Sequence, residues 1–296
     1  EADGSASNGT SGTTVGAAVA INVANVTTEA STGNAKIIAD GLTIQAGMAG
    51  HDGDDMHDVW AKSVSGASGG KVGVAGSFAL NVSNIHTLAT LDPNATLALG
   101  GGDLELKAES KSGSLASAEA AQEKGEEEES TEPQGEGSQT EQSKQTGSTT
   151  GVGASIAINA ADTVTTAVIS KASVTGADAV TVSASAEHEA NANAISGAES
   201  STGVTPVVGI AVVQNTASAT IDADASITAA GDVKISADLT ADTATKVEGS
   251  ADGTKAAVGA ALGLVIVEDA ALASIAGSVT STGGGVEVTS LALTSS

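Results

Sequence analysis

Residues 152–160 read VGASIAINA, and four other stretches of the chain share this pattern. They are VGAAVAINV from Val15, VAGSFALNV from Val74, VTPVVGIAV from Val204 and VGAALGLVI from Val258. The widest interval between successive starts is the one from Val74 to Val152. Apolar residues recur at every second position, the period of a strand with one buried face. We therefore expect five strands whose large aliphatic side chains point into the core, among them those of Ile21, Leu80, Ile158, Ile210 and Leu264.

A second block follows each first block, about half a repeat further along the chain. Its five copies are GLTIQA at Gly41, DLELKA at Asp103, AVTVSA at Ala179, DVKISA at Asp232 and GVEVTS at Gly285. Each copy predicts another short strand. Small turn formers come before these blocks, as at Gly101 and Gly102, where a sharp turn uses the ability of glycine to adopt positive φ.

Five copies of a two-part unit of about 53 residues account for nearly the whole chain. One such unit cannot bury its apolar face alone, so we expect stacking into an all-β, parallel β-solenoid, or β-helix. Because the two blocks are nearly evenly spaced, we expect two coils per repeat, which gives about ten coils and a rod about 48 Å long; three shorter coils per repeat would give about 70 Å. Valine, isoleucine and alanine ladders would fill the narrow interior. The period-two pattern also allows an antiparallel β-sandwich or a laterally repeating sheet.

The domain organisation follows from this periodicity. We expect one domain, 1–296, with repeats at about 14–70, 71–120, 151–202, 203–256 and 257–296 and an acidic low-complexity insertion at 121–150. The gap from a second block to the next first block is nearly constant after the third and fourth copies and longer after the first and second. The two longer gaps contain residues 51–58 and the insertion, so we expect both segments to leave the solenoid on the same flank. Residues 122–150 are expected to be disordered or a mobile loop.

Composition excludes several classes of function. The chain has 11 Lys and no Arg against 36 Asp and Glu, a net charge of −25, which disfavours nucleic acid as a partner. It has no Cys, so no disulfide forms, and Trp60 and Phe78 are its only aromatic residues. The longest apolar stretch, residues 256–267, is too short for a membrane-spanning helix, which requires roughly 20 residues.

Residues 51–58 carry the strongest candidate for a metal site. Asp52, Asp54, Asp55 and Asp58 lie there with two histidines, and carboxylate oxygens are the ligands that calcium prefers. The spacing matches neither an EF-hand loop nor HExxH, so a solvated loop tip is the simpler interpretation. Trp60 follows directly, and we expect it to cap the base of this loop; a platform for a sugar is the alternative.

No catalytic constellation is evident, and we expect no enzymatic activity. Asp222 and Asp224, two positions apart in a predicted strand, are the best carboxylate pair, but no His or Arg accompanies them. Abundant Ser and Thr make any Ser-His-Asp set built on His86 or His188 arbitrary. Asn22, Asn81 and Asn159 share one repeat position, which predicts a stacked ladder of side-chain amides that stabilises a turn.

One segment carries a family resemblance. VGASIAINAADTVTTAVISKASVTGADAVTVSASAEHEANANAISGA, residues 152–198, resembles the passenger repeats of very large bacterial secreted and surface adhesins of the filamentous-haemagglutinin-like and autotransporter types. The resemblance implies a right-handed β-helix stalk, an extracellular or cell-surface location and a role in attachment, and it transfers no site residues.

The expected function is a structural or adhesive stalk, or a fibre-forming segment, of a larger bacterial protein. Its expected partners are copies or neighbouring repeats of the same protein, and cell-surface glycans. The alternatives are a β-helix that binds or cleaves polysaccharides and a calcium-responsive binding module.

Overall fold

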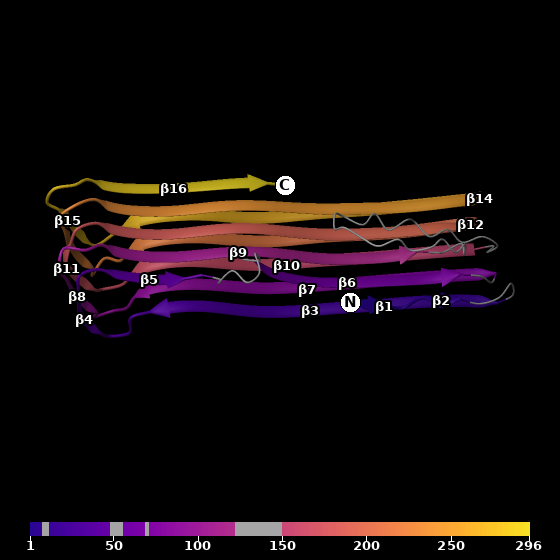
Figure 1. Ribbon diagram of the computed structural model, residues 1–296. Coiled ribbons are helices and arrows are strands. Elements are labelled where there is room, and N and C mark those ends of the chain that lie inside the picture. The colour runs from indigo at the N-terminus through magenta and orange to yellow at the C-terminus, as the bar shows by residue number, and fades with distance from the viewer. Residues whose placement is uncertain (8–11, 48–55, 69–70, 122–149) are drawn as a thin grey trace, which may run out of the picture.

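The computed structural model describes residues 1–7, 12–47, 56–68, 71–121 and 150–296 (Figure 1). These residues form β-strands and no helix, so the described chain has no helical segment that could span a membrane. The strand pairs in these ranges are parallel. The prediction of an all-β, parallel architecture is confirmed, and the arrangement is compatible with a β-solenoid rather than with antiparallel hairpins.

The chain passes repeatedly through three groups of stacked strands, which we call leg 1, leg 2 and leg 3. Leg 1 contains β3 (Thr13–Ser31), β7 (Val72–Leu91), β10 (Thr150–Ile169) and the later parts of β12 (Val180–Ile221) and β14 (Val233–Ile275). Leg 2 is a sheet of short strands, β4 (Lys36–Ala39), β8 (Thr96–Leu99), β11 (Ser173–Ala177), β13 (Ser226–Ala229) and β15 (Ser278–Ser281).

Leg 3 contains β5 (Leu42–Ala46), β6 (His57–Ser68), β9 (Leu104–Ala121), the earlier parts of β12 and β14, and β16 (Val286–Ser295). The two short strands β1 (Ala2–Asp3) and β2 (Ala6–Ser7) pair with β6 and extend leg 3. Legs 1 and 3 are long and run in opposite directions, and leg 2 joins them at one end (Figure 1).

The register follows the sequence repeat. In leg 1, Val15 pairs with Val74, Val74 with Val152, Val152 with Val204 and Val204 with Val258. One repeat therefore makes one circuit through the three legs. The expectation of two coils per repeat is wrong, because the first block of a repeat pairs with the first block of the next repeat and not with its own second block. The stack is about 24 Å high instead of about 48 Å.

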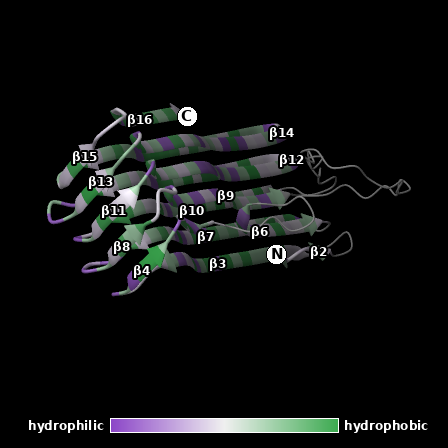
Figure 2. Cartoon of the chain, turned by 60° about the vertical axis from the view of Figure 1, so that its left-hand side comes forward, coloured by the Kyte–Doolittle hydropathy of each residue, from purple (hydrophilic) through white to green (hydrophobic). Residues whose placement is uncertain are grey.

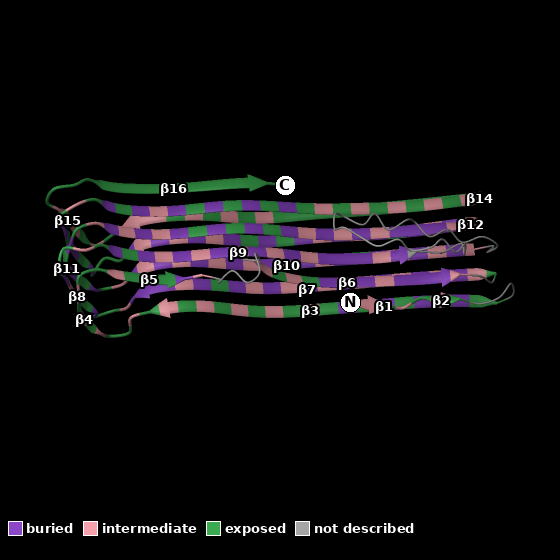
Figure 3. Ribbon diagram, viewed as in Figure 1, coloured by how far each residue is buried: buried purple, intermediate pink, exposed green. Residues whose placement is uncertain are grey.

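The large aliphatic side chains of the five first blocks, in leg 1, point outward, which corrects the expected core. Ile21 is 62% exposed and Leu264 44%, and Leu80, Ile158 and Ile210 are half-buried on the same outer face. Their neighbours in sequence, such as Ala79 and Ala157, are fully buried. Figure 2 shows the alternation as bands of contrasting hydropathy, and Figure 3 shows it as alternating burial along β7 and β12.

The reason for this orientation is the narrow space between legs 1 and 3. Ser77 Oγ donates a hydrogen bond to the backbone carbonyl of Glu119 on the opposite leg at 2.6 Å, and Ser155 Oγ does the same to Ile195 at 2.5 Å. A side chain as short as serine reaches the opposite backbone only when the sheets lie closer than the roughly 10 Å of ordinary stacked sheets. The inward side chains in this gap are mostly those of glycine, alanine, serine, threonine and asparagine, and Ile85, Val207 and Val213 are larger exceptions.

Most of the large buried apolar side chains lie where leg 2 holds legs 1 and 3 apart. There the core contains leucine, isoleucine and valine from all three legs, including Leu91, Leu97, Leu106, Ile169, Ile227 and Ile235. The turn from leg 2 to leg 3 uses Gly101, whose φ of 99° favours glycine, as the sequence predicted. The interior thus has an aliphatic end beside leg 2 and a small-residue seam along the long legs.

The predicted asparagine ladder lies in that seam. Asn22 Nδ2 donates to Asn81 Oδ1 at 2.9 Å, and Asn81 Nδ2 donates to Asn159 Oδ1 at 3.0 Å. The ladder is confirmed, but it stands in the middle of leg 1 rather than at a turn. Asn159 Nδ2 also donates to the backbone carbonyls of Ser114 and Asn191 in leg 3, at 3.0 and 3.1 Å, so the ladder ties the two long legs together.

The two predicted insertions occupy different places in the circuit. Ala46 pairs with Ala108 and His57 with Ser112, so residues 47–56 interrupt the middle of a leg 3 strand. Residues 122–149 separate the end of β9 in leg 3 from the start of β10 in leg 1. They therefore do not start from equivalent positions of the circuit, on which the expectation of a common flank was based. Residues 48–55 and 122–149 lie outside the described ranges, so the predicted disorder of the acidic insertion stays a prediction.

Candidate functional site

The outer faces of the two long legs differ in character. The outer face of leg 1 carries the aliphatic residues described above. The outer face of leg 3 carries charged and polar side chains, with ion pairs between Lys107 and Glu109 at 2.7 Å and between Lys246 and Glu248 at 3.2 Å. Partial exposure makes such pairs weak contributors to stability. This polar face contains a hollow.

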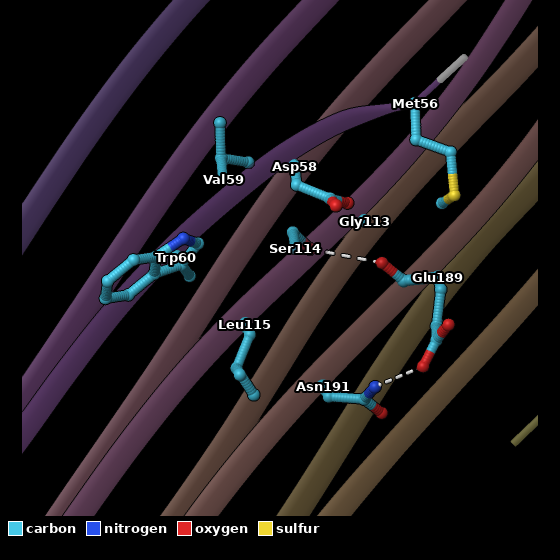
Figure 4. Close-up of a pocket in the computed structure, with 9 residues that line it drawn as sticks. All are labelled: Met56, Asp58, Val59, Trp60, Gly113, Ser114, Leu115, Glu189 and Asn191. Atoms are coloured by element: carbon cyan, nitrogen blue, oxygen red, sulfur yellow. Dashed lines mark hydrogen bonds between the residues drawn. The ribbon is translucent and has the colours of Figure 1, made fainter. Parts of the chain in front are cut away.

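The hollow has a volume of about 390 Å³ and lies over three neighbouring strands of leg 3 (Figure 4). It is lined by Met56, Asp58, Val59, Trp60, Gly113, Ser114, Leu115, Glu189 and Asn191. Two rows of paired residues form its floor. Asp58, Gly113 and Glu189 form one row, and Trp60, Leu115 and Asn191 form the next.

Gly113 opens the floor of the hollow. A Cβ atom at this position would collide with the carboxylate of Asp58. The missing side chain therefore leaves room for the Asp58 carboxylate, and the backbones of Asp58 and Glu189 lie two strand spacings apart, roughly 9.6 Å. Figure 4 shows the two acidic residues on either side of Gly113.

The polar groups around the hollow are partly held in place. Asn191 Nδ2 donates to Glu189 Oε1 at 2.6 Å, which fixes the amide beside the carboxylate. Ser114 Oγ donates a long hydrogen bond of 3.5 Å to the Glu189 backbone carbonyl. Carboxylate oxygens accept hydrogen bonds and donate none, so the hollow offers mainly acceptors to a ligand.

Trp60 adds a flat apolar surface beside these acceptors. Its side chain is 50% exposed and pairs in register with Leu115. A half-exposed indole next to convergent polar groups is an arrangement that binds amphipathic ligands, because the ring packs against apolar surface while the polar groups fix orientation. The prediction that Trp60 caps the loop base involves residues 48–55, which lie outside the described ranges, and stays a prediction.

The predicted calcium ligands are only partly described. Asp52, Asp54 and Asp55 fall outside the described ranges, and Asp58 lines the hollow. Among the described residues, no group of three or more His, Cys, Asp or Glu side chains could hold a metal ion. The calcium site stays a prediction that depends on the three undescribed aspartates.

Asp222 and Asp224 do not lie on a strand, contrary to the prediction. They occupy the turn between β12 and β13, where Asp222 accepts a hydrogen bond from Ser170 Oγ at 2.9 Å and Asp224 lies 3.8 Å from Lys171 Nζ. Both carboxylates thus support turns in adjacent circuits.

No role was predicted for His188 from the sequence, but the structure buries it in the seam between the long legs. Its Nδ1 is 2.7 Å from Ser112 Oγ, and its Nε2 has no hydrogen-bond partner among the described residues. Burial lowers the pKa of His188 to about 4, against a smaller opposing effect of the Asp269 carboxylate. A neutral, enclosed histidine and a buried serine have no access to a substrate, so we assign the pair a structural role.

Leu115, Glu189 and Asn191 line the hollow but were not predicted from the sequence. Gly113 and Glu189 each stand nine positions after the first aliphatic residue of their second blocks, Leu104 and Val180, so alignment of the blocks places these two together. Asp58 can be placed beside Gly113 and Glu189 only when the length of the interruption in the first repeat is known. Comparisons of the chain with protein-family models, curated proteins and solved structures gave no match, and the site is therefore interpreted from its own residues.

Proposed function

We propose that the chain is a structural and adhesive module of a larger bacterial secreted or surface protein, and that it has no catalytic activity. In this proposal it is a right-handed β-solenoid of about five repeats, located outside the cell, that spaces or attaches the parent protein. Its partners are neighbouring repeats or copies of the same protein. The family resemblance of residues 152–198 supports the extracellular location.

One observation carries this proposal, namely the continuous register from circuit to circuit. β7 and β10 pair over 20 consecutive positions, and β12 and β14 pair along almost their entire lengths. At the two ends of the stack, β3 and the later part of β14 each pair with one neighbour among the described strands. An edge strand can pair its outer backbone donors and acceptors with another circuit of the same kind.

A chain with two copies in tandem tests the stalk proposal. Following the strand pairs across leg 3, Ala2 lies at the same height along the strands as Val247, and Ser295 lies at the same height as Asp242. If a second copy continued the stack, its Ala2 would therefore lie five positions beyond Ser295 of the first copy along one strand. A two-residue linker between Ser296 and Glu1 therefore keeps the strand register. A linker of three residues is the matched control, because it turns every side chain of the joining strand to the opposite face.

We expect negative-stain images of the in-register tandem to show one body about 48 Å high, twice the single copy, and calorimetry to show one cooperative transition. The three-residue linker should give two bodies joined by a hinge. Separate bodies with both linkers would contradict the stalk proposal, because the circuits would not continue from copy to copy.

The hollow at Trp60 favours a second candidate function, the binding of a polysaccharide. A sugar ring can pack one apolar face against the indole and donate hydroxyl hydrogen bonds to Asp58 and Glu189. Because these groups are carboxylates on a chain of net charge −25, uronate-rich glycans are repelled. The site chemistry instead suits neutral glycans or glycans with protonated amino groups.

Calorimetric titration with three oligosaccharides of equal length tests this candidate: a neutral glucan, a chitosan oligomer and a polygalacturonate. We expect the neutral or amino oligomer to bind and the uronate oligomer not to bind. Trp60→Ala should abolish the binding, while Trp60→Phe should retain part of it. Binding that is equal in the Trp60→Ala variant, or preference for the uronate, would reject the candidate.

A further inference from the structure

The outer face of leg 1 presents an uninterrupted apolar block. Five outward positions on each of five strands, from the row of Val15 to the row of Val23, carry only apolar residues or glycine. Side chains in the block are exposed even on inner strands, as Ile156 at 39% and Val212 at 36% show. The next row, from Asn25 to Glu268, is polar and forms one boundary.

This apolar block is larger than the apolar patches on the surface of a typical protein. Five strands span roughly 24 Å and ten residues roughly 33 Å, which gives about 800 Å². The largest apolar patch on a typical monomer is about 300–600 Å² and often marks an interaction site. An area of about 800 Å² per partner is that of a standard protein–protein interface, about 1,600 Å² in total.

Charge restricts what can cover the block. The block has no cationic side chain, and the whole chain has 11 cations against 36 acidic residues, so an anionic membrane surface offers no electrostatic attraction. Residues 122–149 contain no Val, Ile, Leu, Met or aromatic residue and therefore lack the apolar surface to match it. The outer face of leg 3 is charged and would lose hydration against the block.

The remaining complementary surface is the block itself. It is uncharged, so two copies placed face to face bring no like charges together within it. We propose that two copies of this chain associate through the outer faces of leg 1 as a closed, two-fold dimer. A two-fold interface uses the same patch on both partners, which an apolar and nearly featureless sheet face permits. This inference does not depend on the stalk proposal, because stacking uses strand edges and the dimer uses a sheet face.

Sedimentation velocity over a concentration series tests the dimer. The double variant Ile158→Glu, Ile210→Glu places charges on two adjacent strands of the block. Ile158→Lys, Ile210→Lys does the same with the opposite sign. Ser183→Glu, Ser236→Glu is the matched control, since these residues are also register partners but lie on the outer face of leg 3.

We expect the unchanged chain and the control to form a dimer that does not grow further. Both isoleucine pairs should raise the dimer Kd by at least about 100-fold, because the cost is desolvation of a charge and not its sign. Far-UV circular dichroism confirms folding of each variant. If a charged variant does not fold, Val208→Thr, Val212→Thr preserves shape and strand propensity and should raise the Kd by about ten-fold.

Three results would overturn the proposal. One is a monomer at every concentration, including a monomer that binds to vesicles of anionic lipid. The second is an equal loss of dimer in the control and the isoleucine variants. The third is open-ended growth into fibres that is insensitive to the isoleucine variants, since growth at the strand edges would then account for all association.

Discussion

Asn81 donates a hydrogen bond to Asn159 at 3.0 Å inside the molecule, although 78 residues separate the two in the sequence. Both side chains are fully buried, and their partners lie on two legs of the circuit. A buried amide without partners would be costly, so this ladder is satisfied only when successive repeats are in register. The polar seam thus contributes specificity to a fold whose long legs pack few large apolar groups against each other.

Removing one amide of the buried ladder should lower the free energy of unfolding more than removing an amide on the surface. Asn159→Ala leaves the Asn81 amide and the Ser114 and Asn191 carbonyls without this partner, and we expect a loss of about 2–3 kcal/mol in the free energy of unfolding. Asn84→Ala, which removes an exposed bond to Asn25, should cost less than about 0.5 kcal/mol. Urea unfolding measures both, and equal losses would argue against a buried ladder.

Glycine substitutions test the narrow gap between the legs. A Cβ at residue 153 would lie 2.5 Å from Ser196 Oγ and 2.7 Å from the Gly197 carbonyl oxygen. Gly153→Ala should therefore destabilise by about 1–3 kcal/mol through overpacking. Gly76→Ala is the control, because a Cβ there meets no atom within 4 Å, and it should be neutral or slightly stabilising. The reverse order in thermal unfolding would contradict the close approach of legs 1 and 3.

Two leucines of equal size test which side of the sheet is inside. Leu106 is fully buried beside leg 2, so Leu106→Ala should cost about 2–5 kcal/mol. Leu80 points outward, and Leu80→Ala should cost less than about 1 kcal/mol when measured below the dimerisation concentration. If Leu80→Ala cost more stability than Leu106→Ala, Leu80 would lie in the core, as its alternating pattern first suggested.

The pH dependence of stability should report on His188. Its pKa is about 4 in the folded protein and 6.5 when exposed, so only the unfolded chain binds the proton between these values. Stability is therefore highest above pH 6.5 and falls toward pH 4, by about 3 kcal/mol from this group. His188→Gln should flatten this part of the curve relative to the exposed control His86→Gln. Curves of identical slope would place His188 in solvent.

The sequence predicted which residues pair between circuits better than it predicted which face of each strand is buried. Tandem blocks at matching positions were sufficient to align Asn22, Asn81 and Asn159, because parallel stacking places equivalent residues side by side. Alternation alone, however, is the same whichever face is buried. The expectation that Ile21 is buried assumed a wide interior, whereas the gap between the long legs holds mostly small side chains.

The candidate site was less predictable than the fold. Trp60 and Asp58 drew attention as rare or charged residues, but Gly113, Glu189 and Asn191 have no distinctive local pattern. Their association depends on how an interrupted first repeat pairs with the second, and the spacing of the blocks alone does not determine this. The number of coils per repeat was wrong for a related reason, since two evenly spaced blocks suit either one circuit or two.

One distance tests most directly the claim that each repeat makes one circuit of a single stack. Asn25 and Glu268 lie on one outward row of leg 1, four strand spacings apart, and the chain has no cysteine to interfere with labelling. Double electron–electron resonance on spin-labelled Asn25→Cys, Glu268→Cys, diluted with unlabelled chain, should give a distance of about 19 Å, four times the strand spacing. A distance of about 38 Å, which two coils per repeat require, would contradict the claim. A broad distribution from independently folded repeats would contradict it as well.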